Sequence, residues 1–99
     1  IAQRCLWAMG SKLVFHAAEV NQDRNIHNLM KDFEAEVPGY LNNKRLTRVL
    51  EELDLTNGTQ NVTENLIICY EALVKEGLFP KKELTLVKAW VDDLTPLLF

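Results

Sequence analysis

Apolar residues recur every three or four positions along almost the whole chain, which is the spacing of one helix face. No segment alternates between apolar and polar residues in the way that a half-buried strand would. The pattern predicts an all-α fold, a compact bundle of about five antiparallel helices with short connections. A pair of stacked helical hairpins would show similar apolar stripes, so that arrangement stays open.

Two of the expected helices lie in the amino-terminal half of the chain. The first covers about residues 2–20, and the polar residues after it break the pattern. Asp23 can then cap a second helix, whose apolar residues continue to Val37. Pro38-Gly39 should end this helix, because a proline disfavours helical backbone in the residue before it.

The third expected helix is capped by Asn42, and the polar residues 56–61 after it form a surface loop. Either Thr63 or Asn61 caps the fourth helix. This helix is apolar on almost every side, so we expect it at the centre of the bundle.

The last turn and the last helix have clear boundaries in the sequence. Gly77 should end the fourth helix in a Schellman motif, with Leu78 behind it. Pro80 suits the first position of the fifth helix, because its missing N–H has no partner there. Pro96 should end or kink this helix near its carboxyl end.

Length and composition limit the class of protein. Ninety-nine residues allow one hydrophobic core, and 47% apolar residues exclude a disordered chain. The net charge of -3 argues against binding nucleic acid through phosphate neutralisation, and no apolar run reaches a membrane span of about 20 residues. Because the chain begins with Ile1, we expect residues 1–99 to be one helical domain excised from a longer intracellular protein of cytoplasm or nucleus.

No short catalytic motif is present. The glycines stand singly, so the chain has neither a phosphate-binding loop nor a dinucleotide fingerprint. Neighbouring acids such as Glu51 and Glu52 point about 100° apart on a helix and do not converge. Cys5 and Cys69 lack zinc-ligand spacing and fit free buried thiols better than a disulfide. These observations predict that the chain is not an enzyme and takes no metal or cofactor.

Two of the expected helices carry their charges against the helix dipole. Lys44, Arg45 and Arg48 lie at the start of one, and Lys81 and Lys82 lie at the start of another. The dipole favours acids at a helix start by about 0.3–1 kcal/mol per charge, so folding alone does not select this order. Either neighbouring acids compensate these cations, or the cations receive an acidic or phosphorylated partner.

The expected first, fourth and last helices also contain more apolar residues than one buried face needs. Tryptophan and phenylalanine are typical interface anchors. The candidates for an exposed patch are therefore Trp7, Phe15, Phe79, Trp90, Leu97, Leu98 and Phe99. A small bundle could equally need these side chains inside its core.

These features favour a non-catalytic adaptor or scaffold domain that holds a helix or linear motif of another protein in an apolar groove with a basic rim. A homodimer is also compatible with this interpretation, whereas a nucleic acid or a membrane is not the expected partner. The residues predicted to bind the partner are Trp7, Lys44, Arg45, Arg48, Lys81, Lys82, Trp90, Leu97 and Phe99.

Two other functions stay open. A secreted helical ligand or carrier would carry glycans at the sequons of Asn57 or Asn61, or a disulfide between the two cysteines. A helical nucleic-acid-binding module would use the basic start of the third helix.

Overall fold

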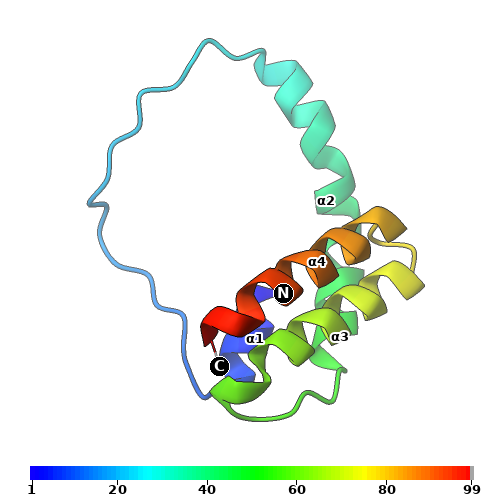
Figure 1. Ribbon diagram of the computed structural model, residues 1–99. Helices are drawn as coiled ribbons and strands as arrows, with labels where there is room; N and C mark the ends of the chain where they lie inside the picture. Colours follow the sequence, from blue (N-terminus) through cyan, green and yellow to red (C-terminus); the bar gives the residue numbers. More distant parts are fainter. Residues whose placement is uncertain (99) are drawn as a thin grey trace.

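The computed structural model describes residues 1–98, and in that range the chain forms four α-helices, a short 3-10 helix and no strand (Figure 1). The elements are α1 (Ala2–Ala8), α2 (Leu29–Glu51), the 3-10 helix η1 (Thr59–Asn61), α3 (Val62–Lys75) and α4 (Lys81–Leu98). The all-helical class is confirmed, but the predicted count of about five helices is wrong.

The predicted compactness is also wrong. The radius of gyration is 16.2 Å, whereas a compact domain of 100 residues has about 13 Å. The difference comes from the first half of α2, which projects from the other helices, and from the long connection that leads to it (Figure 1). The structure is a small packed core with a projecting helix.

The core forms around α3, which contacts α1, α2 and α4. Three of its side chains, Asn65, Cys69 and Leu73, are completely buried. Leu50 of α2 and Cys5 of α1 belong to the same cluster. The predicted central position of this apolar helix is therefore confirmed.

The first predicted helix is much shorter than its apolar pattern suggested, because α1 ends at Ala8. Gly10 has a φ of +80°, a conformation that favours glycine. Its N–H donates to the carbonyl of Trp7, and the N–H of Ser11 donates to the carbonyl of Leu6. These two bonds make a Schellman ending, so the chain leaves the helix here.

Residues 11–28 are not helical, although the apolar pattern continues through them. Their side chains are all exposed, including Leu13 and Val20 of the predicted buried stripe. The segment extends away from the helices and returns at the far end of α2 (Figure 1). Periodicity alone did not form a helix here because no neighbouring surface buries the stripe.

The second and third predicted helices form one continuous helix, α2, which includes Pro38 in its interior. Its cap is Asn28 rather than Asp23, since the Asn28 side chain accepts a hydrogen bond from the N–H of Lys31. The predicted cap Asn42 instead lies inside the helix, where its side-chain amide donates to the Pro38 carbonyl at 2.8 Å. Pro38 removes one backbone donor, and the helix continues in spite of that loss.

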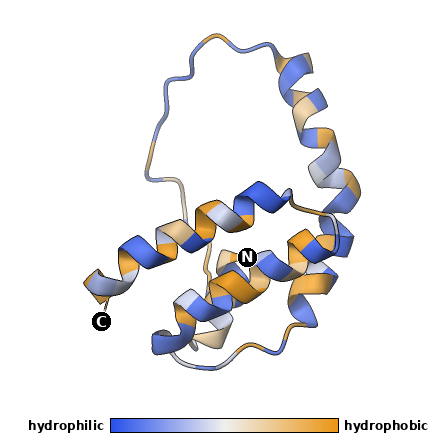
Figure 2. Cartoon of the chain, turned by 45° about the vertical axis from the view of Figure 1, so that its right-hand side comes forward, coloured by the Kyte–Doolittle hydropathy of each residue, from blue (hydrophilic) through white to orange (hydrophobic). Residues whose placement is uncertain are grey.

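The projecting part of α2 carries apolar side chains that no neighbour covers. Leu29, Met30, Phe33, Tyr40 and Leu41 are all more than half exposed. Figure 2 shows hydrophobic positions among the hydrophilic ones along this stretch of the helix. The apolar surplus predicted for the first and last helices is therefore found on α2 as well.

The polar loop predicted between residues 56 and 61 is confirmed, and a buried asparagine holds it in place. Asn65 accepts a hydrogen bond from the N–H of Thr56 at 3.1 Å and donates one to its carbonyl at 2.8 Å. Both functional atoms of the buried amide are thus satisfied by one loop residue. The sequence gives no sign of this role, because Asn65 looks like an ordinary first-turn residue of α3.

The turn between α3 and α4 follows the prediction at Gly77, whereas of the two outcomes predicted for Pro96, an end or a kink of the last helix, the end is wrong. Gly77 has a φ of +70°, and its N–H and that of Leu78 donate to the carbonyls of Val74 and Leu73 in a Schellman motif. Pro80 precedes the first residue of α4 by one position. Pro96 lies inside α4, which continues to Leu98 and does not end at the proline.

The two cysteines are free and buried, as predicted. Cys5 of α1 and Cys69 of α3 meet in the same core cluster. Burial, and after it the neighbouring Cys5 side chain, raise the pKa of the Cys69 thiol from 9.0 to about 11.

This shift predicts a loss of stability in alkaline solution. The folded pKa of Cys69 lies above the unfolded one, so unfolding releases a proton and becomes easier as the pH rises from 9 to 11. The expected loss is about 2–3 kcal/mol of unfolding free energy, measured by urea unfolding under reducing conditions. Cys69→Ala should flatten this pH dependence, and parallel curves for the two proteins would contradict the assignment.

The role of Asn65 predicts a large effect of its removal. Asn65→Ala leaves the Thr56 N–H and carbonyl without their partner, and should lower the unfolding free energy by about 2–3 kcal/mol. Asn61→Ala is the matched control, because the Asn61 side chain makes no capping bond to α3, and it should cost under about 1 kcal/mol. Equal losses in urea unfolding would mean that the buried amide has no special role.

Alanine substitutions at two glycines should change the stability of the protein in opposite directions. Gly77→Ala forces a side chain into a backbone with positive φ and should destabilise the protein by about 1 kcal/mol or more. Gly39 lies inside α2 with open space around it, so Gly39→Ala should stabilise by about 0.5–1 kcal/mol. Thermal unfolding of the two variants tests this, and two shifts in the same direction would exclude the explanation.

Candidate functional site

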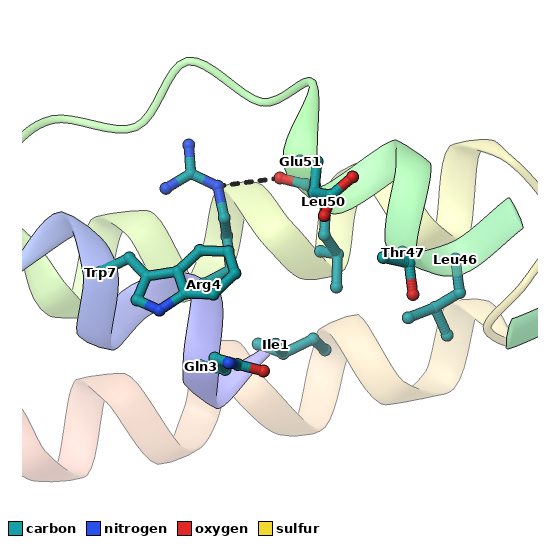
Figure 3. Close-up of a pocket in the computed structure, with 8 residues that line it drawn as sticks. All are labelled: Ile1, Gln3, Arg4, Trp7, Leu46, Thr47, Leu50 and Glu51. Carbon is teal, nitrogen blue, oxygen red and sulfur yellow. Dashed lines mark hydrogen bonds between the residues drawn. The ribbon is translucent and has the colours of Figure 1, made fainter. Parts of the chain in front are cut away.

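A hollow of about 130 Å³ lies between α1 and the carboxyl-terminal end of α2 (Figure 3). Trp7 forms one wall, and the opposite wall comes from α2. The lining residues are Ile1, Gln3, Arg4, Trp7, Leu46, Thr47, Leu50 and Glu51. The hollow thus combines one large aromatic ring with a carboxylate, an amide, a hydroxyl and a guanidinium group.

Arg4 fixes the two walls relative to each other. Its Nε atom donates to the carbonyl of Leu50 at 2.9 Å (Figure 3). Its terminal nitrogen donates to the carbonyl of Leu53, just beyond the end of α2. Carbonyls at the end of a helix have no partner within the helix, so a cation placed there is favourable. A further bond, from the N–H of Gly58 to the carbonyl of Ala8 at 2.9 Å, holds the other end of α1.

Trp7 is half exposed, with 48% of its surface accessible, and its ring borders the hollow. Gln3 precedes it by one helical turn, and Thr47 precedes Glu51 by one turn on α2. Residues four positions apart lie on the same helix face, so each helix presents two of these side chains to the hollow. A flat ring beside hydrogen-bonding groups suits a ligand with one apolar face and several hydroxyls.

Of the residues that line this hollow, Trp7 was predicted as a site residue, whereas Gln3, Arg4, Thr47 and Glu51 were not. The spacing of four between Gln3 and Trp7 was a usable signal. The approach of α1 to the end of α2 was not visible, because these segments are about forty residues apart in the sequence. In the sequence Glu51 stands beside Glu52, whereas in the structure it lines the hollow together with Trp7, which belongs to α1.

Three predicted basic residues gather elsewhere on α2. Lys44, Arg45 and Arg48 line a separate hollow of about 270 Å³ together with Leu41. Arg45 donates to the carbonyl of Glu76 at 2.7 Å and pairs with its carboxylate at 2.9 Å, so it caps the end of α3.

The remaining predicted site residues lie on α4 or beyond the described part of the chain. Lys81 and Lys82 are exposed at the start of α4. Trp90 and Leu97 are 55% and 80% exposed further along the same helix. Phe99 lies outside the described residues. The Trp7 hollow and the basic hollow share no lining residue, and partner binding by the nine predicted residues stays a prediction.

Within residues 1–98, no three His, Cys, Asp or Glu side chains gather in a way that could hold a metal ion. In the same part of the chain, none of the helices has both the length and the apolar character for a membrane crossing.

A family model described as "STELLO glycosyltransferases" matches residues 1–99. No curated protein and no solved structure matches the chain. The match contradicts the prediction of a non-catalytic adaptor or scaffold domain, the prediction that the chain is not an enzyme, and the two alternative functions. The error came from reading the absence of short catalytic motifs as evidence against an enzyme, since a transferase site need not contain such a motif. Over its whole length, the chain belongs to the STELLO glycosyltransferase family.

Proposed function

We propose that this protein acts in sugar transfer as a glycosyltransferase, and that the Trp7 hollow contacts a sugar ring. The family match over residues 1–99 carries the first part of the proposal. The composition of the hollow supports the second part. The intracellular location and the protein partner predicted from the sequence stay predictions.

The chemistry of a sugar ring explains why this hollow is suited to it. A pyranose has faces of C–H groups, which pack on the face of an aromatic ring such as Trp7. Its hydroxyls both donate and accept hydrogen bonds. The Glu51 carboxylate accepts, while the Gln3 amide and the Thr47 hydroxyl do both.

The position of Arg4 supports a preformed site. Its hydrogen bonds to α2 hold α1, and therefore Trp7, at a fixed distance from Thr47 and Glu51. A site whose walls are fixed before binding loses less conformational entropy when the ligand enters. The exposed ring of Trp7 is then available without a rearrangement of the core.

Replacement of Trp7 tests this role in the protein that carries residues 1–99. Trp7→Ala removes the stacking surface and should lower kcat/KM for sugar transfer about 30-fold, mostly through KM. The assay is release of the leaving group from a panel of activated sugar donors, with a panel of saccharide acceptors. Trp90→Ala is the matched control, because Trp90 is similarly exposed but lies on α4, and its activity should stay near that of the parent.

Tryptophan fluorescence tests saccharide binding at the hollow independently of sugar transfer. The sequence contains two tryptophans, so Trp90→Phe leaves Trp7 as the sole indole, and Trp7→Phe leaves Trp90. Saccharide binding should change the fluorescence of the first variant and not of the second. A response confined to Trp90 would exclude the hollow as the site, while absence of transfer with every donor would contradict the enzymatic proposal itself.

A further inference from the structure

Two buried free thiols lie on helices that are far apart in the sequence. Cys5 lies in the middle of α1, and Cys69 lies in the middle of α3. Their exposed fractions are 5% and 0%, and both belong to the core cluster. The two helices contact each other, so both thiols lie buried in one core cluster at the α1–α3 interface.

We propose that Cys5 and Cys69 form a reversible disulfide that fastens α1 to α3 when the protein meets a disulfide oxidant such as oxidised glutathione. Disulfide formation needs two side chains that meet across a short gap, and thiols that point apart cannot be bridged without backbone movement. Two free thiols that share one buried cluster between two contacting helices are placed where such a bond can form. The inference does not depend on sugar binding.

The reaction proceeds by two exchange steps. A thiolate of Cys5 attacks oxidised glutathione, forms a mixed disulfide and releases one glutathione thiolate. The Cys69 thiolate then attacks the Cys5 sulfur and releases the second glutathione, so the S–S bond between the cysteines forms. The two cysteines lose two electrons, one oxidised glutathione gains them, and the cysteine protons end on the two glutathione thiols.

The position of α1 provides the access that this chemistry needs. This helix has only seven residues, and its polar attachments to the rest of the chain include the Arg4 bonds and the Gly58–Ala8 bond. Both cysteines lie in the core cluster between α1 and α3, so undocking of α1 exposes them together. In the docked state, burial raises the pKa of Cys69 and keeps this thiol protonated and unreactive.

The disulfide should have a measurable effect on stability, because it closes most of the chain into one loop. Such a loop restricts the unfolded state, which raises the free energy of unfolding. We expect the oxidised protein to melt at least about 10 °C above the reduced protein.

The test refolds the protein from denaturant in mixtures of reduced and oxidised glutathione, then blocks free thiols and analyses the peptides by mass spectrometry. A linked pair of Cys5 and Cys69 peptides from monomeric protein, with the rise in melting temperature, supports the proposal. Cys5→Ala and Cys69→Ala are matched controls, and neither should show an oxidation-dependent rise.

Other products overturn the proposal. Two free thiols at every glutathione ratio, mixed disulfides with glutathione as the final product, or dimers linked between chains would each show that the cysteines do not pair. A linked pair without a rise in melting temperature would show that the bond distorts the α1–α3 interface, and this too would contradict it.

Discussion

The complete burial of one face of α3, formed by Asn65, Cys69 and Leu73, is the constraint on which the rest of the structure depends. The side chains of Cys69 and Leu73 have no accessible surface, so neighbouring elements must cover this face completely, whereas Glu71 on another side of the helix is exposed. The last turns of α2, the whole of α4 and the short α1 supply this cover. Polar contacts fasten these elements: Arg4 and Arg45 bond to backbone carbonyls at helix ends, Asn65 holds the loop before α3, and Lys88 of α4 pairs with Glu71 of α3. The apolar burial decides which elements meet, and these contacts fix how they meet.

The part of the fold that follows from local chemistry was predictable. The Gly77 ending and the apolar character of α3 depend on residues close together in the sequence, and both predictions are correct. The wrong predictions are of two kinds: a helical pattern that forms no helix because nothing buries it, and a proline that does not end its helix. Residues 11–28 have a helical stripe without a surface to cover it, and α2 accommodates Pro38 because its remaining turns still form hydrogen bonds.

The candidate site was less predictable than the fold. Trp7 was one of the candidates for an exposed patch, with a place in the core left equally open, but its neighbours in the hollow depend on the meeting of α1 with the end of α2. Arg4 creates that meeting by bonding to carbonyls of Leu50 and Leu53, and a carbonyl has no signature in the sequence. The same holds for Arg45. The prediction that Lys44, Arg45 and Arg48 start a helix is wrong, because they lie near the carboxyl end of α2, where the helix dipole favours cations, and Arg45 also pairs with Glu76. The spacing of apolar residues thus does not predict contacts between a side chain and a distant backbone carbonyl.

The long exposed connection between α1 and α2 has a consequence for how the sequence can change. Residues 11–28 contribute no buried side chain, so their cost to the fold is the entropy of closing the loop that brings Arg4 to Leu50. That entropy grows only with the logarithm of loop length, and doubling the segment costs about 0.6 kcal/mol. Insertions and deletions can therefore accumulate in this stretch during evolution while the α1–α3 contact is kept. Among relatives of this chain, length variation should concentrate between Gly10 and Asn28.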